Sequence, residues 1–283
     1  MMSLSPELTK HVNGPRTVAK KLAYAIDDVA KSTAGSVVLA YHRVGGQTAS
    51  PVDLDRSMFR RQMAHVRAAC TVDSADTYVA HHELGRGTAV GPQQRVLLTF
   101  DDGTADFLDE VVPVLVEYDL PATVYVATAH IDEQLDFPAE GKPISWAGLR
   151  DAVSTGLVTV GAHTHTHRLL DRCSVAEVVD ELDRSNARIA EEVGIVPQHF
   201  AYPKAVRAGG LAEREVKRRY RSAAIAGTRP NAPGQTDLYR LHRSPIQVAD
   251  GWEGFQRKLV GGMRVEDDVR RLLNRYRYRG LSQ

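Results

Sequence analysis

The feature that most constrains this chain is a series of short apolar runs separated by longer stretches with helical periodicity. The runs are nearly continuous in apolar residues and cover 36–41 (SVVLAY), 95–100 (RVLLTF), 121–127 (PATVYVA), 157–162 (LVTVGA) and 222–226 (SAAIA). Such runs are typical of strands buried on both faces, as in a parallel sheet. Amphipathic helical spacing occurs between them at 55–70, 105–118 and 175–193, and Ser174-x-x-Glu177 forms a capping box before the last of these. This alternation predicts an α/β fold made of right-handed βαβ units.

The length of 283 residues suits one large α/β domain. Helical patterns at 16–30 and 265–276 flank the strand-containing part of the chain. We expect residues 1–35 to form an N-terminal helical arm packed on the domain. Residues 36–283 are predicted to form that single domain.

Composition excludes several classes of protein. The chain is 43% hydrophobic and 25% charged, which is too apolar for a disordered protein, and it lacks an apolar run of about 18 residues that could span a bilayer. The formal net charge of +1 creates no overall field that would favour nucleic acid. The C-terminal segment is rich in arginine, which fits a solvated helix face or, alternatively, a site for an anionic ligand or membrane surface.

Cysteine content and the N-terminus bear on the cellular compartment. Cys70 and Cys173 are isolated from each other, which argues against a disulfide framework and against a thiolate zinc site. The first 35 residues carry charges throughout and contain no apolar segment typical of a signal peptide. The expected location is therefore cytoplasmic.

Polar residues directly follow four of the strand-like runs. His42 follows the first run, Asp101-Asp102-Gly103 follows 95–100, a histidine-rich segment from His163 to His167 follows 157–162, and Tyr202-Pro203 follows the short run 199–201. In α/β barrels and open α/β sheets, ligands bind at the carboxyl ends of the strands. We expect these side chains to form the functional site.

The two adjacent acids and the histidines suggest a metal site. At the end of a strand the chain turns, so one of Asp101 and Asp102 can bind a metal while the other handles a proton; the alternative is an ordinary polar turn. His163 and His167 are spaced i, i+4, and with Asp102 they would provide two imidazoles and one carboxylate. His165 is expected to point elsewhere.

These motifs resemble those of the polysaccharide deacetylase family, the NodB-homology carbohydrate esterases. The segment 98–103 (LTFDDG) resembles the first family motif, and 161–167 (GAHTHTH) resembles the His-(Ser/Thr)-x-x-His second motif. Further similarity lies in 41–44 (YHRV), 121–124 (PATV) and 200–203 (FAYP), within a region from about 37 to 248. The resemblance implies a distorted (β/α)7-type barrel, a divalent metal that is usually Zn²⁺, and removal of acyl groups from amino sugars.

The chain also departs from the family pattern. Many members have an Arg-Pro-Pro third motif whose arginine orients the catalytic aspartate, whereas this chain has 201–204 (AYPK) and resembles the permuted Tyr-His and Phe-x-Tyr-Pro branch. The glycine usual after that motif is replaced by Lys204-Ala205. The late Leu-x-His motif is unclear, because His242 is the only late histidine. In the permuted branch a histidine after the first strand acts as general acid, so we favour His42 over His242.

The family mechanism assigns a role to each residue. Asp102, His163 and His167 would hold the metal, and Asp101 would act as the base. His42 would protonate the leaving nitrogen, and the backbone N–H of Tyr202, beside Pro203, would bind the oxyanion.

This reading predicts a metal-dependent N-deacetylase. The expected substrate is an N-acetylated amino sugar made in the cytosol, carried on a nucleotide, a lipid or a small glycoside. Two alternatives remain: an amidohydrolase or deformylase acting on a non-sugar amide, and a non-catalytic carbohydrate-binding protein. The second is disfavoured because Asp101 is present beside the metal ligands. The sequence leaves the oligomeric state open.

Overall fold

The computed structural model describes residues 35–85 and 93–263 of the 283-residue chain. The predicted helices at 16–30 and 265–276, the arginine-rich C-terminal segment and all but the last residue of the predicted arm 1–35 lie outside the described residues. Among the helices within those two ranges, none has the length and apolarity needed to cross a membrane.

Seven parallel strands close into a barrel, which confirms the predicted distorted (β/α)7 fold. They are β1 (Val37–Tyr41), β5 (Gln94–Phe100), β6 (Ala122–Val126), β7 (Val158–Ala162), β8 (His199–Ala201), β9 (Ser222–Ala226) and β10 (Leu241–Pro245). Their order around the barrel is β1-β10-β9-β8-β7-β6-β5, and the pairing of β5 with β1 closes the ring. All five apolar runs identified in the sequence form strands of this barrel.

The barrel is distorted at β5. β1 occupies one edge of β5 over Val96–Phe100. On the other edge, an additional strand, β4 (Cys70–Asp73), pairs with the first half of β5 up to Leu97, and β6 pairs with only Thr99 and Phe100. A separate parallel pair consists of β2 (Arg43–Val44) and β3 (Asp53–Leu54).

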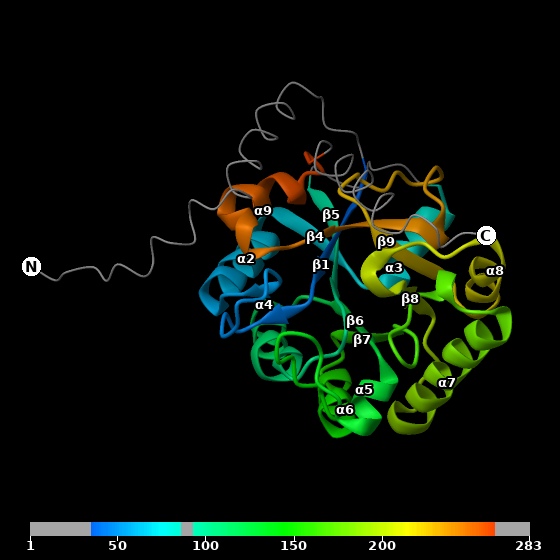
Figure 1. Cartoon of the computed structure of the whole chain (residues 1–283). Helices are drawn as coiled ribbons and strands as arrows, with labels where there is room; N and C mark the ends of the chain where they lie inside the picture. The colour runs from blue at the N-terminus through cyan, green and yellow to red at the C-terminus, as the bar shows by residue number, and fades with distance from the viewer. Residues whose placement is uncertain (1–34, 86–92, 264–283) are drawn as a thin grey trace, which may run out of the picture.

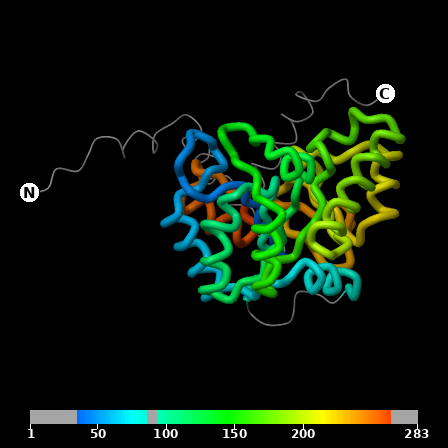
Figure 2. Tube along the Cα trace, turned by 90° about the horizontal axis from the view of Figure 1, so that it is seen from below, coloured from blue at the N-terminus to red at the C-terminus, as the bar shows by residue number. Residues whose placement is uncertain are grey.

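Helices cover the outside of the barrel (Figure 1). They are α2 (Arg56–Ala69), α3 (Ala75–Glu83), α4 (Val112–Tyr118), α5 (Thr128–Glu133), α6 (Trp146–Ser154), α7 (Val175–Val193), α8 (Gly210–Arg219) and α9 (Gly251–Leu259). Figure 2, turned by 90°, shows the blue helix α2 on one side of the molecule and the yellow-green helices α7 and α8 on the other. The capping box at Ser174 and Glu177 is present at the start of α7.

The predicted helices differ from the observed ones at their ends. The pattern at 55–70 ends one residue earlier, because Cys70 already begins β4. The pattern at 105–118 is divided into a π-helical turn at Phe107–Val111 and the short helix α4.

Strand alternation places two kinds of side chain on the two faces of the barrel wall. The odd residues Val37, Leu39 and Tyr41 of β1 pack with the outer helices in the large hydrophobic cluster. Val38 of β1 and Leu97 of β5 belong to a smaller cluster with Ala224 and Leu241, against which α3 packs. This second set fills the barrel interior. The same parity directs Thr99 and Asp101 inward from β5, and Arg243 inward from β10.

Candidate active site

The turn after β5 places two neighbouring carboxylates at the carboxyl end of the barrel. Asp101 continues the inward parity of its strand, whereas Asp102 and Gly103 both have left-handed backbones, with φ of 75° and 83°. A side chain at position 103 would have its Cβ 2.8 Å from Cγ1 of Val126, so glycine is required there for close approach to β6. The predicted polar turn therefore exists. It also delivers both carboxylates to one site.

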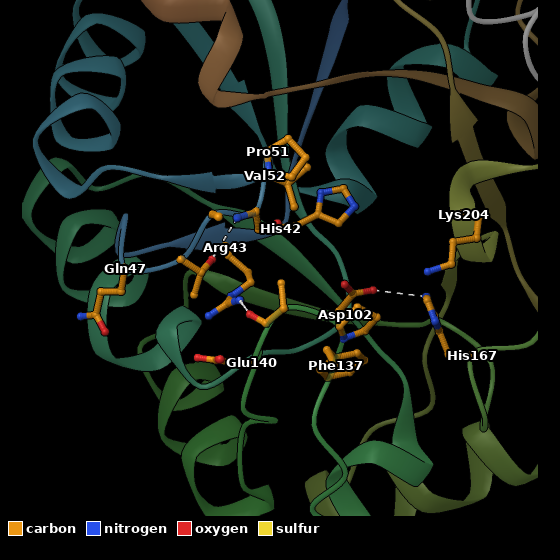
Figure 3. A pocket seen from close by; sticks show the side chains of 15 residues that line it. His42, Arg43, Gln47, Pro51, Val52, Asp102, Phe137, Glu140, His167 and Lys204 are labelled. Atoms are coloured by element: carbon orange, nitrogen blue, oxygen red, sulfur yellow. Dashed lines mark hydrogen bonds and ion pairs between the residues drawn. The ribbon is translucent and has the colours of Figure 1, made fainter. Parts of the chain in front are cut away.

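Asp102, His163 and His167 converge as the sequence predicted. The Oδ1 atom of Asp102 lies 3.6 Å from Nε2 of His163 and 3.3 Å from Nε2 of His167. Within the described ranges, these three residues form the one group whose donor atoms all lie within 4.8 Å of one another in a way that suits a metal ion. Figure 3 shows His167 pointing at Asp102.

The protonation states fit a metal site. Nδ1 of His163 lies 2.7 Å from the carbonyl oxygen of Ala201, and since a carbonyl only accepts, Nδ1 carries a proton and Nε2 is the ring nitrogen that faces Asp102. Burial lowers the pKa of His167 despite the opposing effect of Asp102, which favours a neutral imidazole. Burial raises the pKa of Asp102, but the contacts with the two histidines lower this pKa by more. The pKa of Asp102 therefore lies well below its ordinary value. Two neutral imidazoles and an ionised carboxylate are the forms that bind a divalent cation.

A glutamate on α7 holds the histidine loop. Glu181 is 5% exposed, and its Oε2 accepts hydrogen bonds from the backbone N–H groups of His165 and Thr166 at 3.0 and 2.8 Å. The Thr166 hydroxyl donates to the other carboxylate oxygen. This carboxylate stabilises a loop in which Thr164 and His167 adopt left-handed backbones. Nδ1 of His165 lies 2.8 Å from Oγ1 of Thr128, and His165 does not belong to the group of three.

Asp101 forms a buried ion pair with an arginine that sequence reasoning missed. Nη1 and Nη2 of Arg243 lie 2.5 and 2.8 Å from the two carboxylate oxygens, and the side chains are 1% and 4% exposed. Nη1 of Arg243 is also 3.3 Å from Oγ1 of Thr99, and the guanidinium lies 5.4 Å from the ring of Tyr125. Burial raises the pKa of Asp101, but Arg243 and two nearby histidines lower it by more, so the pKa lies below its ordinary value. Asp101 is therefore ionised and held in a fixed orientation.

One signal in the sequence pointed to Arg243. The sequence analysis noted that the chain lacks the arginine expected in the third motif, so a cation beside Asp101 had to be sought on another strand. Arg243 is the last residue of the unclear late motif at 241–243, which lies in β10.

The two candidate histidines for the general acid lie on opposite faces of the barrel wall. His42, just after β1, lines the pocket, and its Nε2 lies 3.9 Å from Oδ2 of Asp101. His242 neighbours the inward-facing Arg243 and therefore faces outward. A Cβ placed on Gly227 would be 2.3 Å from Nδ1 of His242, which locates this ring beside Gly227. His42 is the better placed of the two.

The segment after β8 differs from the prediction. The backbone N–H of Tyr202 donates to the carbonyl of Ala224 at 3.1 Å, as part of the contact between β8 and β9. This N–H is therefore engaged, which argues against Tyr202 as the oxyanion donor. Pro203 is buried. The next residue, Lys204, lines the pocket instead, and sequence reasoning did not identify it.

The site opens into a pocket of about 790 Å³ (Figure 3). Its walls come from His42, Asp102, His167, Lys204 and two loops, 47–52 and 137–140. A neighbouring hollow of about 280 Å³ shares Arg43, Gln47 and Glu140 with this pocket. The two hollows are therefore adjacent on the surface, with these three residues lining both.

Comparisons with known proteins agree with this geometry. Residues 89–222 match the sequence model of a family described as polysaccharide deacetylase. A poly-β-1,6-N-acetyl-D-glucosamine N-deacetylase of Staphylococcus aureus (strain N315) is 28% identical over 124 residues, or 40% of this chain and 41% of that protein. A chitooligosaccharide deacetylase of Bradyrhizobium sp. (strain ANU 289) is 34% identical over 116 residues, covering 40% and 48% of the two chains. This chain thus spans less than half the length of these relatives.

Solved structures share the fold. The Streptococcus pyogenes deacetylase PplD in complex with acetate has a TM-score of 0.69 and 19% identity, covering 80% of this chain and 99% of that chain. IcaB from Ammonifex degensii has a TM-score of 0.67 and 22% identity, covering 81% and 98% of the two chains. At these identities the similarity establishes the architecture alone.

Proposed function

Since this chain is a homologue of the polysaccharide deacetylases and has their barrel, we propose that it hydrolyses N-acetyl groups from amino sugars in a metal-dependent reaction. The observation that carries the proposal is the juxtaposition of two sets of groups at one end of the barrel. Asp102, His163 and His167 form a metal-binding set, and Asp101 lies beside them, ionised and oriented by Arg243.

The donor set suits a zinc ion. Two imidazole nitrogens and one carboxylate oxygen are the ligands of many catalytic zinc sites, which leave a position open for water or substrate. When bound, the metal polarises the acyl carbonyl and makes a water molecule more acidic. This chemistry is needed because an amide is a poor electrophile at neutral pH.

Asp101 is proposed to take the proton of the attacking water. Its carboxylate is ionised and cannot rotate freely, because both oxygens are bound by Arg243. His42 is proposed to donate a proton to the leaving nitrogen. Its Nε2 is 3.9 Å from Asp101, so the group that gains a proton and the group that gives one are neighbours. Tyr202 has no role in this proposal, because its N–H is engaged.

The size of the pocket favours an oligosaccharide over a small non-sugar amide. A small closed pocket would suit a deformylase, whereas here the pocket has a volume of about 790 Å³ and a second hollow lies beside it. The relatives named above act on poly-N-acetylglucosamine and on chitooligosaccharides. We propose β-linked N-acetylglucosamine oligomers as the substrate class. Nucleotide-linked, lipid-linked and free N-acetyl sugars, including those made in the cytosol, are the alternatives to test.

A substrate panel tests this proposal. Purified protein is incubated with free N-acetylglucosamine, its nucleotide-linked and lipid-linked forms, and chitin and poly-β-1,6-linked oligomers, and released acetate is measured. We expect acetate from oligomers, abolished by a chelator and restored by Zn²⁺. Release of formate or ammonia from small amides, without acetate from any sugar, would overturn the proposal.

Variants test the assigned roles. Asp101→Asn should keep its metal and lose about 10²–10⁴-fold in turnover, because it removes the base without removing a ligand. The double variant His163→Ala, His167→Ala should lose the metal itself, measured by elemental analysis. His42→Ala should lower turnover far more than His242→Ala, which serves as the matched control. The opposite order of the two histidine variants would show that His242 is the acid.

A further inference from the structure

Lys204 occupies a strained position at the wall of the proposed active site. It has φ of 56° and ψ of 12°, and Ala205 beside it also has a positive φ, of 54°. Two consecutive non-glycine residues in the left-handed region are unusual, because the Cβ atom of each crowds the neighbouring backbone. The turn is held by hydrogen bonds from the N–H groups of Ala205 and Val206 to the carbonyls of Tyr202 and Pro203, at 2.8 and 3.4 Å.

This conformation directs the lysine ammonium into the pocket. Figure 3 shows the side chain of Lys204 extending toward Asp102 and His167. The side chain is exposed, so a ligand in the pocket has access to it.

The described part of the chain offers Lys204 no negative partner. Lys204 forms no ion pair with any residue in the two described ranges. Asp101 is bound by Arg243, and Asp102 belongs to the proposed metal site. Glu140, the remaining carboxylate of the pocket wall, lies on the opposite side of the pocket in Figure 3.

We propose that Lys204 binds an acidic group of the substrate, a carboxylate or a phosphate, close to the acetamido group that is hydrolysed. This inference rests on the proposed deacetylase function and narrows it to anionic N-acetylated saccharides. The other cation of the pocket wall is less suited to this role. Arg43 donates to the carbonyl of Ala139 at 2.5 Å and lies 3.9 Å from Asp106, so its charge is partly compensated.

The test compares three N-acetylglucosamine oligomers of equal length: one neutral, one with a uronic acid residue, and one with a phosphate ester. Acetate release is measured for the wild type, Lys204→Gln, Lys204→Arg and Lys217→Gln. Lys217 lies on α8 outside the pocket wall and pairs with Glu213, so Lys217→Gln removes one positive charge elsewhere.

For the wild type, we expect a higher kcat/KM with at least one anionic oligomer than with the neutral one, and a decrease of this preference at high salt. Lys204→Gln should abolish the preference by lowering kcat/KM for the anionic oligomer about tenfold more than for the neutral one, mainly through KM. Lys204→Arg should retain it, as should Lys217→Gln. The two anionic oligomers distinguish a carboxylate from a phosphate.

The outcomes separate this inference from the proposed function. Equal or better hydrolysis of the neutral oligomer by the wild type would overturn the role of Lys204 and leave the deacetylase function intact. An equal loss on all three oligomers in Lys204→Gln, through kcat, would show instead that Lys204 acts on the reacting amide. If no oligomer is deacetylated by the wild type, the proposed function itself fails.

Discussion

Replacement of Arg243 by methionine should destabilise the protein strongly. Arg243 and Asp101 are 1% and 4% exposed and joined by two hydrogen bonds, so Arg243→Met leaves a buried carboxylate without its partner. Removing one member of a buried ion pair costs about 3–5 kcal/mol, whereas a typical domain is stable by only about 5–15 kcal/mol. We therefore expect a folded but much weakened protein. It should also be inactive, because Asp101 loses the group that orients it.

A second variant shows whether the unpaired charge is the cause. In the double variant Arg243→Met, Asp101→Asn, both charges are absent, and we expect about 2–3 kcal/mol of the lost stability to return. Arg184→Met is the matched control. Its pair with Asp180 is solvent-exposed, with side chains 56% and 61% accessible, and should contribute about 0–1 kcal/mol.

The free energy of unfolding is measured by urea denaturation, followed by the fluorescence of the two tryptophans. Two results would refute the reasoning. One is a loss in Arg243→Met no larger than in Arg184→Met. The other is a double variant that is as unstable as Arg243→Met, because the cost would then come from lost packing and not from the buried carboxylate.

Three further predictions follow from buried groups. Glu181→Gln should weaken Zn²⁺ binding about 10–100-fold, measured in competition with a chelator, because the Glu181 carboxylate holds the loop that carries two ligands. Unchanged affinity would show that other contacts hold this loop. Burial raises the pKa of Cys70 to about 11, so at pH 8 the more exposed Cys173 should react with a thiol reagent first, and Cys173→Ser should remove the fast phase. Burial lowers the pKa of His199 in the folded state, so the unfolded state binds a proton more readily. The free energy of unfolding should therefore fall as the pH drops below about 6.5. His199→Gln should show a smaller fall between about pH 7 and 5.5, measured by urea denaturation.

The sequence alone determined most strands of the barrel and the main members of the site, but it did not identify β10. Strands buried on both faces need continuous apolar side chains, and the residues that follow them must meet at the same end of a closed parallel sheet. These requirements are local, so they can be seen without knowing which strands are neighbours. For this reason Asp101, Asp102, His163 and His167 could be assigned to one site from their positions after two strands.

Short helices and strand ends were harder to predict. Helices α3 and α6 have nine residues each, and the sequence analysis identified neither. The end of α2 was placed one residue too late, because Cys70 suits the apolar face of the helix as well as the first position of β4. Cys70 belongs to β4 because β4 pairs with the first half of β5. This part of β5 is available for pairing because β6 pairs with β5 only at Thr99 and Phe100.

The tertiary structure decided which charges meet. Arg243 and Asp101 are 142 residues apart in sequence and become partners only because β10 and β5 both flank β1 and direct these residues into the barrel. The same closure pairs β8 with β9, which engages the N–H of Tyr202 and leaves Lys204 to face the pocket. The local sequence pattern indicates which residues are buried and which positions end a strand. Pairing between buried polar groups depends on strand order and on the direction in which each side chain points, and both are set only when the sheet closes.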